Sequence, residues 1–110
     1  MMTSEELTGF ITQTNKKGRV SVLFGKEFPI TMIGVNDEKK TINLIFDMRL
    51  SNIGGVKTKK LLKILKGYND YTIIVSNRER SLIALTVGIE KMKRGIAVVT
   101  LPHAMAYYDE

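Results

Sequence analysis

Asp47 and His103 carry the side chains best suited to acid–base chemistry in this 110-residue sequence. Asp47 follows an apolar run, where a carboxylate could act as a general base or a metal ligand, but no second carboxylate stands at a matching position. His103 is the only histidine and has no serine or cysteine partner at a recognisable spacing, so a nucleophile–base pair is missing. We therefore expect a protein that is not an enzyme and that has no metal or cofactor site.

A glycine-containing loop and the helix expected after it form the most suggestive binding feature. Helix starts offer free N–H groups and the positive end of a dipole, so an anion could rest there. The loop is not a Walker A motif, because no glycine directly precedes Lys57, and its glycines could serve only to turn the chain into the helix. The predicted partner-binding residues are Ser51, Asn52, Gly54, Gly55, Lys57, Thr58, Asn77 and Arg78.

The charge balance is a second indication of partners. The formal net charge of +6 favours acidic partners, such as nucleic acid, an anionic membrane surface or an acidic protein, although small domains also need net charge for solubility. Lysines line one face of the segment 57–66, and Arg78 and Arg80 stand close together further on. Both groups could contact phosphates or could simply be solvated.

Length and composition indicate one globular domain that covers residues 1–110. Apolar residues make up 44% and charged residues 25% of the chain, which is typical of a folded protein and unlike a disordered one. The absence of cysteine excludes disulfides and thiolate metal sites, so we expect a cytoplasmic protein. No stretch approaches the roughly 18 apolar residues of a membrane span, and none is expected.

The first half of the chain is rich in strand signals. Residues 9–24 are predicted to form a β-hairpin with strands at 10–14 and 19–24. Residues 29–35 could be a short strand or a short helix with Pro29 in its first position. The apolar run 41–46 is predicted to be a strand.

The second half is predicted to alternate between helices and strands. The expected elements are a helix at 56–66, a strand at 71–75, a helix at 78–93, a strand at 96–99 and a terminal helical turn at 102–108. The helix at 78–93 would turn Leu82, Leu85, Ile89 and Met92 inward. Because strand–helix–strand units require right-handed crossovers, the predicted fold class is α/β. We expect a mixed β-sheet with an N-terminal hairpin followed by parallel crossovers, and helices mainly on one face.

The order of these elements resembles the STAS domain, the fold of bacterial anti-sigma-factor antagonists. Residues 20–25 resemble a strand and glycine of that family, 44–47 the strand before its signature loop, 71–77 the next strand and 101–107 the terminal helix. The resemblance implies a regulatory module that docks a protein partner through residues 51–60. The family's phosphorylated serine would fall within 55–58, where Thr58 is the nearby hydroxyl and hence the implied phosphoacceptor.

The sequence thus predicts a non-catalytic, cytoplasmic module that binds a protein partner. The alternative is a small basic nucleic-acid-binding domain that uses the lysine face with Arg78 and Arg80. Aromatic residues are few and do not interleave with the basic run, which counts against that alternative because single strands are usually bound by stacking.

Overall fold

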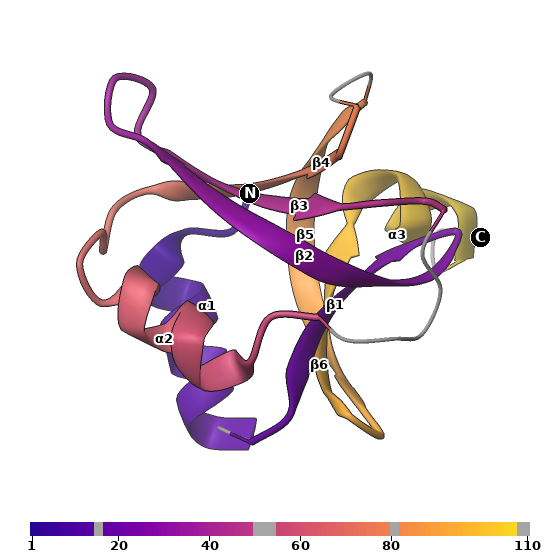
Figure 1. Cartoon of the computed structure of the whole chain (residues 1–110), viewed down its shortest axis with the longest axis horizontal. Coiled ribbons are helices and arrows are strands. Elements are labelled where there is room, and N and C mark those ends of the chain that lie inside the picture. Colours follow the sequence, from indigo (N-terminus) through magenta and orange to yellow (C-terminus); the bar gives the residue numbers. More distant parts are fainter. Residues whose placement is uncertain (15–16, 50–54, 80–81, 108–110) are drawn as a thin grey trace.

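The computed structural model describes residues 1–14, 17–49, 55–79 and 82–107. Six strands form a closed barrel in which each strand pairs with the next one along the chain and the sixth pairs with the first (Figure 1). The strands are β1 (Arg19–Phe24), β2 (Lys26–Asn36), β3 (Thr41–Phe46), β4 (Thr72–Asn77), β5 (Ile83–Met92) and β6 (Gly95–Thr100). The helices are α1 (Ser4–Thr14), α2 (Thr58–Leu65) and α3 (Leu101–Tyr107).

Two of the six strand pairs are parallel. β3 pairs in parallel with β4, and α2 lies between these strands in the sequence. β1 pairs in parallel with β6, from Arg19 opposite Gly95 to Leu23 opposite Val99, and this pairing closes the barrel. The remaining four pairs are antiparallel.

The core fills the inside of the barrel, because apolar residues at every second strand position point inward. Ile42, Leu44 and Phe46 of β3 are fully buried in this way. Helices α1 and α2 lie next to each other on one side of the barrel (Figure 1) and add Leu7, Leu61 and Leu65, among others, to the same core. Helix α3 instead packs on the outside of the barrel against β1, β5 and β6.

The predicted strand at 10–14, and with it the hairpin at 9–24, is wrong, because residues 4–14 form α1. The N–H of Thr3 donates to Glu6 Oε1 at 3.2 Å, and the N–H of Glu6 donates to Thr3 Oγ1 at 3.2 Å. This reciprocal pair is a capping box, and Met2 and Leu7, at the two positions of a hydrophobic staple, both join the core. Leu7 and Ile11, one helical turn apart, are fully buried.

The predicted helix at 78–93 is also wrong, because residues 83–92 form β5. Ala84 and Thr86 are buried inside the barrel, whereas Leu85 between them faces outward, which is the alternation of a strand. A register shift between Thr86 and Gly88 then changes the phase, so Ile89 packs against the core. Leu85 and Ile89 have the four-residue spacing that is typical of one helix face. The register shift between them places these two side chains on opposite faces of the strand.

These corrections change the fold class from α/β to a closed β-barrel. The crossover predicted from 71–75 to 96–99 is absent, because β5 runs between β4 and β6 and pairs antiparallel with both. The barrel is therefore not the α/β arrangement that the resemblance to the STAS domain implied. Residues 29–35, which could have been helix or strand, belong to β2. The strands expected at 19–24, 41–46, 71–75 and 96–99 and the helices expected at 56–66 and 102–108 are confirmed, with small shifts of their ends.

Candidate interaction surfaces

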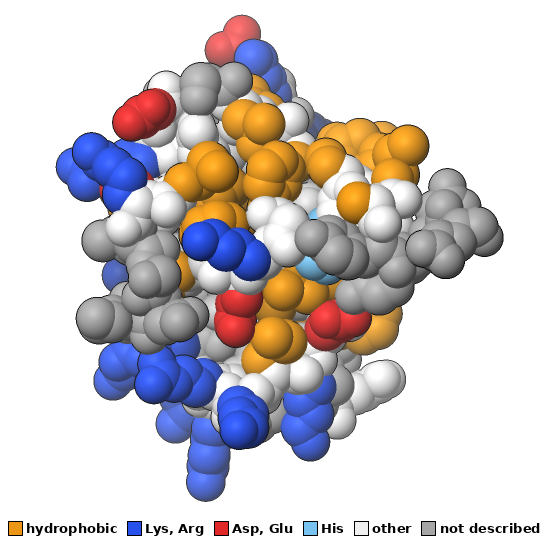
Figure 2. All heavy atoms as spheres, turned by 90° about the vertical axis from the view of Figure 1, so that its right-hand side faces the viewer, with side chains coloured by type: hydrophobic (Ala, Val, Ile, Leu, Met, Phe, Trp, Pro, Cys, Tyr) orange, Lys and Arg blue, Asp and Glu red, His pale blue; other side chains and the backbone are white. Residues whose placement is uncertain are grey.

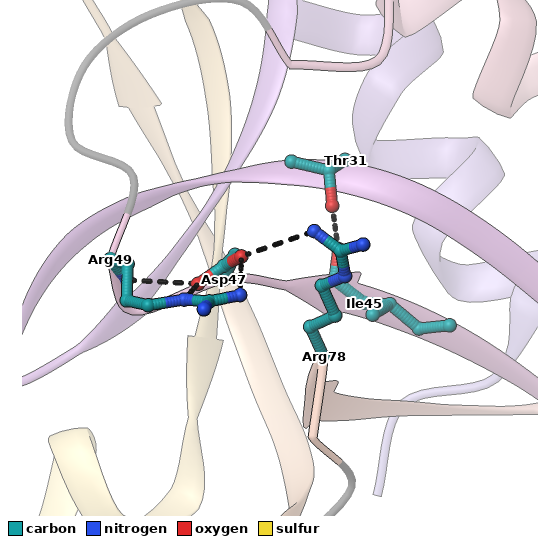
Figure 3. Close-up of polar contacts among 5 residues, drawn as sticks. All are labelled: Thr31, Ile45, Asp47, Arg49 and Arg78. Atoms are coloured by element: carbon teal, nitrogen blue, oxygen red, sulfur yellow. Dashed lines mark hydrogen bonds and ion pairs between the residues drawn. The ribbon is translucent and has the colours of Figure 1, made fainter.

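Asp47 lies directly after β3 and is held by two arginines (Figure 3). Its carboxylate is buried and accepts hydrogen bonds from the backbone N–H of Arg49 at 2.9 Å and from Nε and Nη2 of the same residue at 3.1 and 3.0 Å. Nη1 of Arg78, which follows β4, lies 3.7 Å from Oδ2 of Asp47. The backbone N–H of Arg78 also donates to the carbonyl of Phe46 at 2.6 Å, so the ends of β3 and β4 are tied twice.

This arrangement makes Asp47 a structural anchor. The side-chain hydrogen bonds of Arg49, followed by its backbone N–H, lower the pKa of Asp47 from 3.8 to about 2. Such a carboxylate is a poor base near neutral pH, because a general base works best with a pKa close to the operating pH. Among the described residues, no group of three or more His, Asp or Glu side chains is placed to hold a metal ion.

His103 also has a structural contact. Its Nδ1 atom accepts a hydrogen bond of 3.0 Å from the backbone N–H of Gly25, in the turn between β1 and β2, and its ring is buried. The backbone N–H of His103 donates to Thr100 Oγ1 at 3.4 Å. His103 therefore fastens α3 to the outside of the barrel.

The predicted binding residues fall into two groups. Ser51, Asn52 and Gly54 lie outside the described residues. Gly55 and Lys57 line one hollow together with Arg19, whereas Asn77 and Arg78 lie at the end of β4 beside Asp47. Lys57 and Gly55 thus lie at the hollow around Arg19, and Arg78 lies at the carboxylate of Asp47.

Thr58, the implied phosphoacceptor, begins α2 with its side chain in the protein interior. Its backbone N–H donates to the carbonyl of Gly18 at 3.0 Å, and its residue is fully buried. The Oγ1 atom is buried and has no hydrogen-bond partner. A kinase could not reach this hydroxyl in the folded structure, so phosphorylation would require local unfolding.

Lysine and arginine side chains gather around three adjoining hollows at one end of the barrel, which we call the basic end. All three hollows are lined by Arg19, whose Nη1 donates to the carbonyl of Gly55 at 2.5 Å. The cations that line the hollows are Lys17, Arg19, Lys57, Lys59, Lys60, Lys93 and Arg94. Among the described lining residues, Glu27 is the one carboxylate.

The start of α2 adds to the positive potential of the basic end. Lys57 is the N-cap residue and makes no side-chain capping bond, and the first turn of α2 contains no acidic residue. The first turn instead carries Lys59 and Lys60. Lysines at the positive end of a helix dipole destabilise the helix, so the needs of folding do not account for this cluster.

A second surface covers the outside of β2, β3, β4 and β5, and we call it the outer sheet face. Its residues form two rows across the four strands, as the pairing registers place them: Met32, Ile45, Ser76 and Ile83 in one row, and Gly34, Asn43, Ile74 and Leu85 in the next. The one polar pair is satisfied internally, because Ser76 Oγ donates to Asn43 Oδ1 at 2.9 Å. In the view of Figure 2, hydrophobic side chains gather in the upper part of the molecule, and Lys and Arg lie along its lower edge and at its upper left.

The two side strands of the outer sheet face are exposed, although Ile45 and Ser76 in its middle are buried, whereas the opposite outside of the barrel is covered. On β1 and β6, the outward residues Leu23, Ala97 and Val99 are buried in a small cluster with Ala104 of α3. On the outer sheet face, Met32 is 56% exposed and Ile83 is 66% exposed, and Leu85 is 38% exposed. Val87, further along β5, is 43% exposed.

Most residues of both surfaces were not predicted from the sequence. Arg19, Lys93 and Arg94 come together only through the pairing of β1 with β6, which no local pattern reveals. Leu85, an outer residue of β5, was assigned to the inner face of a helix, although the alternation of residues 83–87 was a strand signal.

Comparison with known proteins adds no relative. No family model matches the chain, no curated protein matches it and no solved structure matches it. Among the described residues, we find no helix with the length and apolar character needed to cross a membrane.

Proposed function

We propose that this protein is a non-catalytic module that docks a partner protein on its outer sheet face. The observation that carries the proposal is the exposure of Met32 on β2 and of Ile83 and Leu85 on β5, at the two sides of one four-strand face of a barrel whose other outside is covered by α3. Exposed apolar side chains that gather on one face of a small protein commonly mark interaction sites, because leaving them in water forfeits the free energy of burial.

A groove across this face gives the partner a place to insert a side chain. The groove is lined by residues of β2, β3, β4 and β5, including Gly34, Ile45, Ile74 and Ile83. Gly34 leaves it open, since a Cβ atom added there would meet nothing within 4 Å. Apolar anchors that fill such pockets supply most of the affinity in protein interfaces.

The charges next to the face indicate what the partner carries around its apolar anchor. Arg78 follows β4, two residues after Ser76, and Arg49 lies near it at Asp47. Their side chains are 64% and 67% exposed and face two carboxylates, Asp47 and Glu79, so the described charges of this rim balance. Lys39 lines the groove itself. We expect a partner with an apolar anchor and an acidic group that meets Lys39, because complementary charges at an interface favour encounter.

The test is a matched pair of glycine substitutions. Gly34→Met fills the groove without strain, whereas Gly9→Met adds the same side chain at an open position on α1, away from the outer sheet face. Each variant and the wild type are immobilised and exposed to nuclease-treated lysate. A protein held by the wild type and by Gly9→Met is then purified, and its affinity for each is measured by calorimetry.

We expect one-to-one binding that Gly34→Met weakens by at least tenfold, or about 1.4 kcal/mol. Equal affinity for all three proteins would refute the proposal. Dimers of the wild type in sedimentation that dissociate with Gly34→Met would refute it as well, because the face would then be covered by a second copy of this chain.

A further inference from the structure

We infer that the basic end is a second binding site, for the phosphate backbone of double-stranded nucleic acid. This function is separate from the proposed docking of a protein, because it uses residues on a different surface. The cations of the basic end come from three segments of the chain, at 17–19, 57–60 and 93–94, which the closed barrel brings around Arg19.

The residue types decide between nucleic acid and an acidic protein. Five of the seven cations are lysines, and lysine is depleted in protein interfaces, whose energy depends on aromatic and apolar anchors. Lysine and arginine together are the residues that contact DNA and RNA phosphates, where they release condensed counterions. The basic end therefore fits a polyphosphate better than a protein surface.

The shape of the site decides against a small ligand. The three hollows have volumes of about 290, 390 and 300 Å³ and open next to one another around Arg19. Each is close to the lower limit of small-molecule sites, and the cations among their lining residues outnumber apolar residues such as Pro29, Met92 and Val56. Adjoining shallow hollows lined by cations instead suit successive phosphates of one long ligand.

The absence of stacking groups decides between double and single strands. Of the described residues that line the hollows, none is aromatic. Proteins that hold single strands without sequence preference usually stack bases on aromatic rings, so a mainly cationic site without aromatic residues favours the outside of a duplex. Contacts to phosphates carry no sequence information, and we expect binding that is independent of sequence.

Arg19 is the central contact of this site. Its guanidinium is held in place by the carbonyl of Gly55 and lies between the hollow lined by Lys93 and the hollow lined by Lys60. A planar guanidinium fixed in this way can still donate its remaining N–H groups to a phosphate.

The experiment measures fluorescence anisotropy of two labelled 20-base-pair duplexes of unrelated sequence, titrated with the whole chain between 50 and 200 mM KCl. If about five phosphates are neutralised, the slope of log K against log salt is about −4.5, and affinity falls roughly 500-fold over this range. Both duplexes are expected to bind equally. Binding that is absent at 50 mM KCl, or that does not change with salt, would overturn the inference.

Charge-matched variants test the location of the site. Lys57→Glu combined with Lys93→Glu should reduce the magnitude of the slope by about 2 and weaken binding strongly, since two phosphate contacts are lost. Lys39→Glu combined with Lys63→Glu makes the same change of net charge at positions that do not line the hollows, and should have a much smaller effect. Equal weakening by both pairs would mean that net charge alone attracts the duplex, and would overturn the site.

Two further measurements separate this inference from its alternatives. Gly34→Met, which fills the groove of the outer sheet face, should leave duplex affinity unchanged, so the two proposals can fail independently. Poly-glutamate should compete weakly against the duplex at equal charge concentration. If poly-glutamate competes as well as unlabelled duplex, the basic end binds an acidic protein, and the inference is wrong.

Discussion

Nη1 of Arg78 lies 3.7 Å from Oδ2 of Asp47, which joins the residue after β4 to the residue after β3. β3 and β4 are parallel neighbours, and the longest connection of the barrel, which includes α2, leaves the end of β3 and leads to the start of β4. The contact therefore holds the end of β3 to the end of β4. The stability of the barrel should therefore depend on the charge of Asp47.

Asp47 should make the protein sensitive to acid. Because its pKa is lowered to about 2 in the folded state, the stabilisation that it provides is complete above its ordinary pKa of 3.8 and is lost as the pH falls toward 2. Asp47→Asn should lower the melting temperature at pH 7 and should flatten the loss of stability between pH 4 and 2. Urea unfolding at a series of pH values measures this, with Glu38→Gln on the exposed β2–β3 turn as the control. If Asp47→Asn keeps the acid sensitivity of the wild type, the contact does not stabilise the barrel.

Two buried threonines should respond in opposite ways to the same substitution. The Thr58 hydroxyl is buried without a partner, whereas the Thr86 hydroxyl is buried and donates to the carbonyl of Ile73 at 2.9 Å. Replacing threonine by valine keeps the shape and removes the hydroxyl. Thr58→Val should raise the free energy of unfolding by about 1 kcal/mol, and Thr86→Val should lower it by about 1 kcal/mol, because only Thr86 loses a hydrogen bond. Chemical denaturation measures both, and a loss in both would show that the Thr58 hydroxyl has a partner in solution.

Gly95 should tolerate no side chain. Its φ is +145°, and a Cβ atom there would lie 2.2 Å from the carbonyl oxygen of Arg19 and 2.6 Å from its nitrogen. These are backbone atoms of the strand that pairs with β6, so they cannot move aside without opening the barrel. Gly95→Ala should cost at least about 2 kcal/mol of unfolding free energy. Gly34→Ala, at a position with open space, should be neutral or slightly stabilising. A similar small effect of both changes in thermal unfolding would argue against this closure of the barrel.

The sequence was informative about local structure wherever apolar periodicity was unambiguous. β1, β3, β4 and β6 were predicted from short β-branched runs, and α2 from its apolar stripe. Helix α1 was missed although Thr3 and Glu6 stand at the spacing of a capping box, because the β-rich residues at 10–14 were weighted more heavily. Helix and strand were confused at β5 because the bulge after Thr86 breaks the alternation.

The two surfaces could be predicted only in part. Gly55 and Lys57 were predicted to be binding residues from their place at a helix start, and the structure places them in the lining of the basic end. Arg19 and Lys93 could not be linked to them, because that proximity depends on the pairing of the first strand with the last. The outer sheet face likewise depends on which strands are neighbours, and this is decided by the closed barrel rather than by any short segment.

The parallel pairing of β1 with β6 also has a consequence for synthesis on the ribosome. β1 leaves the exit tunnel well before β6, the partner strand that closes the barrel. Contacts between residues so distant in the chain are slow to form, because a large loop must close before they contribute. The nascent chain should therefore remain open along one side of β1 until β6 has emerged, and chaperones would have that exposed strand edge to bind during this interval.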